Sequence, residues 1–391
     1  MIKKRYLQPY IVSDLKEKMV FIGGPRQVGK TTMAQSIGKN DYIRPIYLNW
    51  DFRDDRKKII DEKFESEADL IIFDEIHKYK TWRNYLKGEF DKNKDKFKIL
   101  VTGSARFDLY RRGGDSLLGR YHYLRLHPFS AREILDKKPD IEILRELKFI
   151  KDKKIGNIFD RLFLFGGFPE PFIKKDLKVL RRFHNERLDR LIKEDIRDIE
   201  NIRDLSALQI LVEILPTKVG SLFSINSLKE DLGVTHKTIS LWVDILERFY
   251  YHFRIYPFAS SIIKSLRKEP KMYLWDWSQI EDEAAKLENM IASHLLKMAH
   301  FLYDTEGHKV ELNFLRDREG REVDFLITVN KKPWMAVEVK LNDDEISKNL
   351  KYFAKKLKIP FVYQVIKEKN VDFTQNNIRV ISADKFLSGL V

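Results

Sequence analysis

The chain has 391 residues, no cysteine and a formal net charge of +14; 43% of its residues are hydrophobic and 34% are charged. This length predicts two or three domains. The lack of cysteine excludes disulfides, a thiolate nucleophile and cysteine-ligated zinc or iron–sulfur sites, so any metal must be held by oxygen atoms or histidines, and Mg²⁺ is the expected metal. No apolar run approaches the roughly twenty residues that cross a bilayer, and the first residues do not lead into a signal peptide, so we expect a cytoplasmic protein without membrane contact. The positive charge favours a polyanionic partner, nucleic acid first, although a solvated lysine-rich surface would give the same balance.

The first predicted strand, residues 19–22, leads into a glycine-rich segment and then into a helix-like run, residues 33–37. The segment between them reads Gly24, Pro25, Arg26, Gln27, Val28, Gly29, Lys30, Thr31 and Thr32. A strand that turns through glycines into a helix leaves backbone N–H groups free to surround the phosphates of a nucleotide such as ATP. In this G-x-x-x-x-G-K-T spacing, Lys30 supplies charge to the phosphates and Thr31 supplies a hydroxyl to Mg²⁺. We therefore interpret the segment as a P-loop rather than as a glycine-rich turn with an incidental lysine.

A second strand is predicted at residues 45–51, and a third begins near residue 68 and ends in Asp74 and Glu75. A continuous apolar run that ends in carboxylates is typical of a central parallel strand whose carboxyl end faces the phosphates, as a Walker B strand does. Asp74 is then expected to hold Mg²⁺ in its outer shell, and Glu75 to polarise the water that attacks the γ-phosphate. The alternative is an ordinary strand end with a polar cap.

A further apolar strand, beginning at residue 98, also ends in polar residues. In nucleotidases of the additional-strand type, such a strand lies between the P-loop strand and the Walker B strand, and its terminal polar group senses the γ-phosphate. Thr102 and Ser104 are the candidates for that group.

Three later segments complete a family resemblance: residues 117–121 read LLGRY, residues 126–130 read LHPFS, and residues 165–171 read FGGFPEP. With the motifs above, they make most of the chain resemble the prokaryotic AAA-type ATPases that carry a C-terminal DUF4143 domain. The resemblance implies a P-loop α/β domain and a homo-oligomer, with a hexamer-type ring as one form. It also makes Arg120 the first candidate for an arginine finger that acts on a neighbouring subunit, with Arg106 and Arg112 as competitors. The alternative for Arg120 is a surface arginine on a basic loop.

The middle of the chain is predicted to be helical up to residue 203, and apolar residues at helical spacing there are expected to pack between helices. These residues are Leu188, Leu191, Ile192, Ile196 and Ile199. Residues 204–260 are predicted to form three helices followed by strands, the pattern of a winged helix. Thr235 is expected to cap the third helix, which places His236, Lys237 and Thr238 at the exposed start where recognition helices contact DNA. The alternative is a winged helix that serves only for packing.

The last part of the chain is predicted to contain a hairpin of residues 321–329 and 334–340. Pairing across this hairpin brings Asp324 opposite the segment that holds Glu338 and Lys340. With Glu288 on the preceding helix, this pattern resembles the PD-(D/E)XK nuclease-like fold, in which carboxylates bind Mg²⁺ and the lysine orients the nucleophile or neutralises charge. The alternatives are a fold retained for binding alone and the polar face of an ordinary hairpin.

The predicted domain order is an AAA-type ATPase domain at residues 1–135, a helical region at 136–203, a winged helix at 204–260 and a nuclease-like domain at 261–391. The leading hypothesis is an oligomeric, DNA-associated ATPase in which hydrolysis of ATP moves or remodels DNA, including branched DNA. An ATP-dependent nuclease is the first alternative. The second is a nucleotide-gated regulator whose last two domains bind protein.

Overall fold

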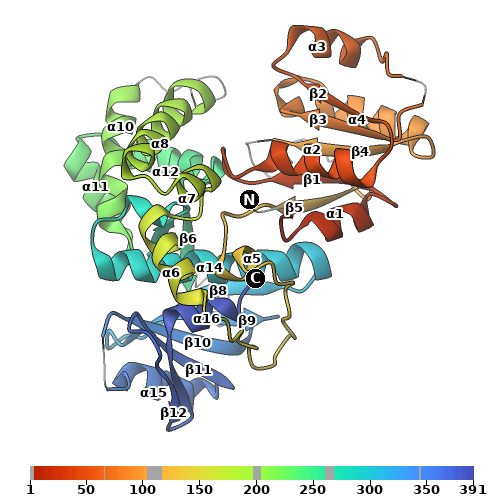
Figure 1. Cartoon of the computed structure of the whole chain (residues 1–391). Helices are drawn as coiled ribbons and strands as arrows, with labels where there is room; N and C mark the ends of the chain where they lie inside the picture. The colour runs from red at the N-terminus through yellow and green to blue at the C-terminus, as the bar shows by residue number, and fades with distance from the viewer. Residues whose placement is uncertain (1–3, 66, 104–116, 197–203, 260–267, 343–344) are drawn as a thin grey trace. The chain divides into compact units, whose positions relative to one another are not determined.

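The computed structural model of the chain describes residues 4–65, 67–103, 117–196, 204–259, 268–342 and 345–391. The described residues form two compact units (Figure 1), and each unit has its own sheet. The first unit takes in residues 1–127 with 248–250, and the second takes in residues 128–247 with 251–391. In the described part of the chain, no helix combines the length and the apolar character that crossing a bilayer requires.

The first unit is built on a parallel sheet with the strand order β2-β3-β4-β1-β5 (Figure 1). Its strands are β1 (Met19–Gly23), β2 (Pro45–Asn49), β3 (Leu70–Asp74), β4 (Lys98–Thr102) and β5 (Tyr121–Arg125). Its helices are α1 (Gln8–Asp14), α2 (Lys30–Asp41), α3 (Arg53–Ile60) and α4 (Trp82–Asn93). Every residue of β1 and β3 is buried, as expected for central parallel strands. Because β4 lies between β1 and β3, the predicted position of the additional strand is confirmed.

The core of the first unit joins this sheet to α4. Trp82 and Leu86, four residues apart and therefore on one face of α4, are both buried in the core. The Trp82 ring lies 6.0 Å from the ring of Phe21 on β1. The parallel pairing of β4 with β1 and β3 brings the carboxyl ends of these three strands together at one edge of the sheet.

The second unit begins with helices: α5 (Ala131–Ile134), α6 (Ile155–Phe165), α7 (Pro169–Lys174), α8 (Leu177–Arg190), α10 (Leu205–Ile214), α11 (Ile225–Leu232) and α12 (His236–Arg248). The end of α8 continues into a π-helical turn in which Leu191, Ile192 and Ile196 of the predicted stripe are buried, whereas Leu188 in α8 is half-buried. Ile199, the last residue of that stripe, lies outside the described residues.

The boundaries of α11 and α12 follow from local chemistry. Gly233 ends α11 with φ 65, a left-handed value that suits glycine. The Thr235 hydroxyl caps α12 by accepting the N–H of Thr238 at 3.2 Å. Thr235 therefore has its predicted capping role.

The strands of the second unit form one sheet with the order β12-β13-β11-β10-β9-β8-β6-β7. They are β6 (His252–Pro257), β7 (Lys271–Leu274), β8 (Val310–Arg316), β9 (Glu322–Val329), β10 (Lys332–Lys340), β11 (Phe361–Ile366), β12 (Asp372–Gln375) and β13 (Ile378–Ser382). The predicted hairpin is present as β9 and β10, and Asn330 and Lys331 in its turn have φ 48 and 65, as a type I′ turn requires. β6 pairs with β7 and also with β8, so the strands that follow α12 belong to this larger sheet.

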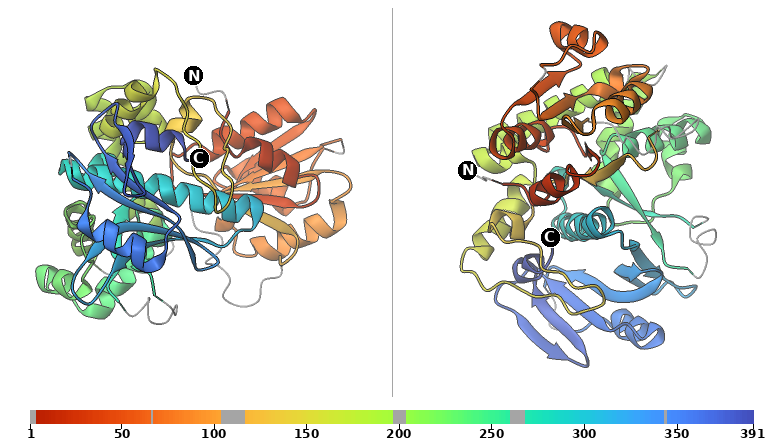
Figure 2. Two further views of the ribbon diagram at one scale, coloured as in Figure 1. Left: turned by 90° about the horizontal axis from the view of Figure 1, so that it is seen from below. Right: turned by 90° about the vertical axis from the view of Figure 1, so that its right-hand side faces the viewer.

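Two helices cover the sheet of the second unit. α14 (Glu283–Glu306) packs against β7, β8 and β10, and α15 (Lys348–Leu357) packs against β9 and β10 from the other side (Figure 2). The short helix α16 (Ala383–Ser388) follows β13. The sheet is therefore covered on both faces.

Candidate functional site

The P-loop joins β1 to α2 through a turn that depends on glycine. Gly24 has φ 140, and a Cβ atom there would lie 2.4 Å from the backbone oxygen of Leu126. Gly29 has φ 97 and immediately precedes the first turn of α2. A larger side chain at Gly24 would therefore collide with fixed backbone, and both residues adopt backbone conformations that glycine adopts without strain.

Lys30 is held against the backbone of this turn. Its Nζ atom donates to the carbonyl oxygens of Gly24 and Pro25, both at 2.8 Å, and the residue is 7% exposed. The ammonium group is thus already inside the loop that would surround a phosphate. A phosphate at this loop would offer it stronger, charged acceptors than the two carbonyls.

Asp74, the last residue of β3, accepts hydrogen bonds from three hydroxyl groups. Thr31 Oγ1 donates to Oδ2 at 2.7 Å, and the Tyr47 hydroxyl donates to the same atom at 2.8 Å. Thr102 Oγ1 donates to Oδ1. Burial, together with the hydrogen bond to Asp74, raises the pKa of Tyr47, so that residue stays a donor. Thr31 and Asp74, the pair predicted to hold Mg²⁺, are joined by a direct hydrogen bond. Both side chains present the oxygen atoms that Mg²⁺ prefers.

Glu75 lies immediately after β3 in a left-handed conformation, with φ 54. Its N–H donates to the Thr102 carbonyl oxygen at 3.0 Å, which ties it to the end of β4. Its Oε2 lies 3.5 Å from Nε2 of His77. Burial lowers the pKa of His77, so the imidazole is neutral at pH 7. Because the Glu75 side chain is 17% exposed, a water molecule can reach the carboxylate.

The remaining predicted residues of this site differ in burial, and some lie outside the described part of the chain. Arg26 and Gln27 are half-buried, Val28 is buried, and Thr32 is exposed at the start of α2. Ser104 lies outside the described residues, as do the arginine-finger competitors Arg106 and Arg112. Of the two predicted sensor hydroxyls, the structure therefore describes only that of Thr102, and it contacts Asp74.

Arg120 lies at the end of the sheet opposite to its own P-loop. Its carbonyl oxygen accepts the N–H of Met19, the first residue of β1, whereas the P-loop follows the last residue of β1. The guanidinium makes a two-point ion pair with Asp91 on α4, with Nε at 2.7 Å and Nη2 at 3.0 Å from the carboxylate oxygens. The hydrogen bond to Asp91 raises the pKa of Arg120. This topology separates Arg120 from the nucleotide site of its own chain.

At the start of α12, His236 and Lys237 are exposed and Thr238 is half-buried. Thr238 also shares a hydrogen bond of 2.8 Å between its hydroxyl and that of Thr235. Two of the three predicted DNA contacts are thus accessible, while the third takes part in the helix cap.

The C-terminal carboxylates gather around a lysine that the sequence did not indicate. Lys271, 2% exposed at the start of β7, lies 3.3 Å from Glu288 Oε1, 2.7 Å from Glu322 Oε1 and 3.4 Å from Asp324 Oδ1. Burial alone would lower the pKa of Lys271, but these three carboxylates raise it, so the ammonium stays charged. Asp324 is also fixed by the N–H of Val339, 2.9 Å from its Oδ2.

Glu338 belongs to the same electrostatic group. Its Oε1 lies 3.2 Å from Lys340 Nζ, while Oε2 is buried and makes no hydrogen bond to a described residue. Burial and then the charge of Asp324 raise the pKa of Glu288 to about 7 and that of Glu338 to about 7. Among the described residues, however, no group of three or more histidine or carboxylate side chains is arranged so that it could hold a metal ion. The predicted residues Glu288 and Asp324 do lie around one cation, which is the ammonium of Lys271.

The comparisons with known proteins divide the chain into three matched segments. Residues 16–135 match the family model of an AAA domain. This segment, which holds the P-loop, is therefore similar to an AAA domain. Residues 156–280 match a domain of unknown function, DUF8612, and residues 284–386 match another, DUF4143. The AAA segment contains the P-loop, Asp74, Glu75 and Arg120, and the DUF4143 segment contains all four of the C-terminal carboxylates described above.

Relatives span most of the chain. An uncharacterized protein of Methanocaldococcus jannaschii is 25% identical over 366 residues, which cover 88% of this chain and 80% of that protein. An uncharacterized protein of Haemophilus influenzae is 22% identical over 358 residues, which cover 83% of this chain and 83% of that protein. Among solved structures, the Thermotoga maritima RuvB Holliday junction branch migration motor is 19% identical, with a TM-score of 0.32 over 63% of this chain and 87% of that chain. This TM-score is too low to add to the assignment of the AAA segment.

Proposed function

We propose that the chain hydrolyses ATP with Mg²⁺ at the P-loop of its AAA domain. The observation that carries the proposal is the hydrogen bond of 2.7 Å between Thr31 and Asp74, next to a buried Lys30. A hydroxyl on the P-loop helix and a carboxylate at the end of the neighbouring β-strand are the pair that P-loop nucleotidases use around the metal. A glycine-rich turn with an incidental lysine would have no reason to hold this pair together.

Each residue has a separate task in this proposal. The P-loop N–H groups and Lys30 bind the phosphates, and Thr31 and Asp74 hold the metal. Mg²⁺ bound there would neutralise charge on the β- and γ-phosphates. Glu75, whose orientation is set by its left-handed backbone and by His77, positions the attacking water and accepts its proton.

We further propose that the active form is a homo-oligomer in which Arg120 completes a neighbouring site. Arg120 lies at the far end of the sheet from its own P-loop, so it can reach a nucleotide only in another subunit. Its pair with Asp91 holds the guanidinium in place before assembly. An arginine that stabilises the transition-state charge is worth orders of magnitude in rate.

DNA is the proposed partner of the second unit. The net charge of +14 supports a polyanion, and exposed His236 and Lys237 lie at the start of α12, where a recognition helix contacts DNA. ATP hydrolysis in the first unit would then change how the second unit holds DNA. A nucleotide-gated regulator that binds protein instead remains the alternative from another class.

We propose that the C-terminal domain binds rather than cleaves. The element order α14-β8-β9-β10-α15-β11 and the positions of Glu288 and Asp324 support a nuclease-like fold. Lys271, however, already supplies a positive charge to these carboxylates and to Glu322, where a nuclease would use Mg²⁺. The domain is therefore assigned a structural or DNA-binding role.

Phosphate release tests the central part of the proposal. Wild-type protein with ATP and Mg²⁺ should release phosphate, and single-stranded, duplex or branched DNA should raise the rate. Release that no DNA changes would favour the protein-binding regulator, and no release with or without DNA would contradict the proposal.

Nicking of supercoiled plasmid tests the role of the C-terminal domain. With Mg²⁺ or Mn²⁺ and ATP, wild-type protein should leave the plasmid intact. Nicking that disappears in Asp324→Ala, while phosphate release persists, would establish the nuclease alternative instead.

A further inference from the structure

A row of lysines follows one face of α15 and its end. Lys348, Lys351 and Lys355 are spaced three and four residues apart, which places them within an arc of about 60° on an α-helix. Lys358 caps the helix three residues later. All four are exposed, and none of them makes an ion pair with a described residue. Residues 348–358 contain no acidic side chain, so this face carries charge of one sign over about 15 Å.

The opposite face of α15 explains why this charge stays on the surface. Leu350 and Phe353 are buried in the core against the sheet, with Ile346 and Ile359 on either side of the helix. No apolar side chain of the helix is therefore available to enter a lipid bilayer, which membrane-bound amphipathic helices need. The lysine row fits a soluble polyanion better than a membrane surface.

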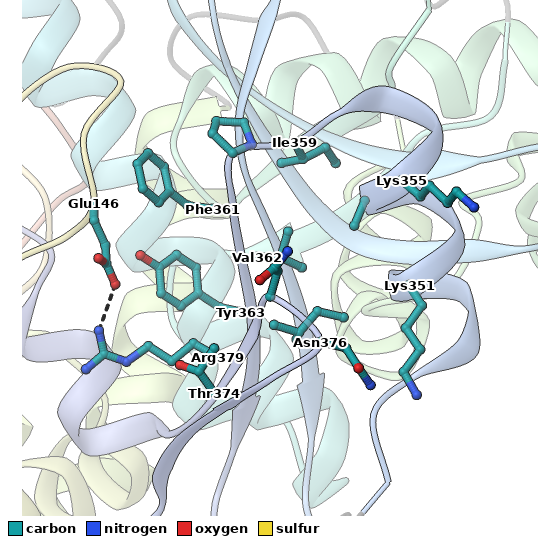
Figure 3. A pocket seen from close by; sticks show the side chains of 14 residues that line it. Glu146, Lys351, Lys355, Ile359, Phe361, Val362, Tyr363, Thr374, Asn376 and Arg379 are labelled. Carbon is teal, nitrogen blue, oxygen red and sulfur yellow. Dashed lines mark hydrogen bonds and ion pairs between the residues drawn. The ribbon is translucent and has the colours of Figure 1, made fainter.

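A pocket of 740 Å³ opens beside two of these lysines. Figure 3 shows Lys351 and Lys355 extending from α15 at one side of it and Glu146 and Arg379 at the other. This volume lies within the range of about 300–1,000 Å³ typical of small-molecule sites. Arg379 is already neutralised by Glu146 and Asp372, so the lysines are the cations that remain for a ligand.

The walls of the pocket have the chemistry of a nucleotide site. Asn376 and Asn377, in the turn between β12 and β13, offer amide donors and acceptors, and Thr374 offers a hydroxyl. Half-buried Phe361 lines another part and can contact the face of a base. Amide groups complement base edges, and lysines complement phosphates.

We propose that α15 and this pocket, which we call the α15 groove, bind single-stranded nucleic acid, with one unstacked nucleotide in the pocket and the adjoining phosphates along the lysine row. A base can enter a pocket only when it is unpaired, so the groove selects a single strand over a duplex. This inference rests on the proposed association with DNA and adds its location and strandedness. It adds a second contact, separate from the one proposed at the start of α12.

Salt-dependent binding of a labelled single-stranded oligonucleotide tests the lysine row. The variant Lys348→Gln/Lys351→Gln/Lys355→Gln/Lys358→Gln should bind at least tenfold more weakly. The slope of log K against log [salt] should fall by about 3, since each lost phosphate contact on a single strand contributes about 0.7. The control Lys151→Gln/Lys153→Gln/Lys154→Gln/Lys174→Gln removes the same charge from exposed positions elsewhere in the second unit and should keep the wild-type slope. Unchanged melting curves check that each variant is folded.

A second pair of variants tests the pocket. Thr374→Trp fills its mouth and should weaken binding of the single strand several-fold without changing the salt slope. Gln375→Trp adds the same ring to the other face of β12 and should have no effect. In both wild type and controls, duplex DNA of the same length should compete poorly.

Three results separate failure of this inference from failure of the proposed function. If wild type binds the single strand and the α15 variant binds it as tightly as the control variant does, the proposed role of the α15 groove is wrong, while the proposed association with DNA is unaffected. If Thr374→Trp and Gln375→Trp bind the single strand equally well, the proposal that a nucleotide enters the pocket is wrong. If wild type binds neither strand form, the proposed association with DNA fails and the inference fails with it.

Discussion

At the scale of single residues, the nucleotide site is organised around Asp74. Its three hydroxyl donors come from α2, β2 and β4, which are separated in sequence and meet only because of the strand order. The carboxylate is 4% exposed, so these bonds satisfy a group that would otherwise be costly to bury. The position of Asp74 is therefore set before any ligand binds.

Lys30→Ala should weaken ATP binding by about tenfold to a hundredfold, because hydrogen bonds to charged groups contribute roughly 1.5–3 kcal/mol. Titration with a fluorescent ATP analogue measures the change. Lys39→Ala, which removes an exposed lysine from the last turn of the same helix, should bind as wild type does. Equal affinity of the two variants would contradict the role given to Lys30.

Two buried histidines, His252 and His294, should make the free energy of unfolding depend on pH. Burial lowers the pKa of His252 to about 4 and that of His294 to about 3 from the ordinary value of 6.5. Between pH 6.5 and 4 these two histidines therefore bind protons in the unfolded chain but not in the folded chain, so their contribution to the free energy of unfolding should fall as the pH falls. Glu288 and Glu338, whose pKa values are raised to about 7, act in the opposite direction, so a single variant is needed to isolate the histidine contribution. Near pH 5, each histidine contributes about 1.4 kcal/mol per pH unit.

The variant His252→Gln isolates one of these contributions. Glutamine can still donate to the Val243 carbonyl oxygen, which His252 Nε2 contacts at 3.0 Å, but it does not titrate. Urea unfolding measures the free energy of unfolding at pH 6 and at pH 5. The loss of this free energy between pH 6 and pH 5 should be smaller by about 1 kcal/mol in the variant than in wild type. An unchanged difference would mean that His252 is protonated in the folded chain.

At the scale of elements, contiguous motifs were predictable from the sequence and distant contacts were not. The P-loop, the strand that ends in Asp74 and the β9–β10 hairpin are each specified by neighbouring residues, so periodicity and turn chemistry indicated them. Tyr47 and His77 carry no local signal, because their contacts depend on strand order and burial.

Lys271 illustrates the same limit in the C-terminal sheet. It comes 53 residues before Asp324, at the start of a short strand, and nothing in its neighbourhood marks it as the partner of three carboxylates. The sequence predicted Glu288 and Asp324 but not Glu322, and it assigned the countercharge of these carboxylates to Mg²⁺. Only the pairing of β6 with both β7 and β8 brings the lysine to them.

Lys271→Met should destabilise the second unit by about 3–5 kcal/mol, because it removes a buried ammonium group and leaves half-buried Glu288 and Asp324 without that countercharge. The control Lys268→Met changes an exposed lysine three residues earlier and should have little effect. Thermal unfolding measures both. A loss no larger than that of the control would show that the lysine is dispensable and would reopen the site to a metal ion.

At the scale of the whole molecule, the account requires an assembly. Arg120 is fixed by Asp91 at the end of the sheet opposite to its own P-loop, so its proposed action on a nucleotide needs a second subunit. An arginine that only supports the fold would act through Asp91 and within one chain. These two roles give different results when subunits are mixed.

Arg120→Ala and Glu75→Gln should each abolish phosphate release, and mixing the two proteins in exchanging oligomers should restore part of it. Rescue is expected because some interfaces then combine an intact Glu75 with an intact Arg120. Asp91→Ala removes the intrachain partner but leaves the finger, so it should keep most of the activity. If mixing restores nothing and Asp91→Ala is as inactive as Arg120→Ala, Arg120 has only a structural role.

The most direct test of the central claim, that this P-loop site hydrolyses ATP, is the turnover of Glu75→Gln measured beside its affinity for ATP. The substitution keeps the shape of the side chain and removes the group that orients water and accepts its proton, so ATP binding should equal that of wild type while turnover falls about a hundredfold or more. Glu17→Gln, at an exposed position of the same unit, should keep the wild-type rate. Turnover by Glu75→Gln at the wild-type rate, with ATP binding intact, would contradict the account.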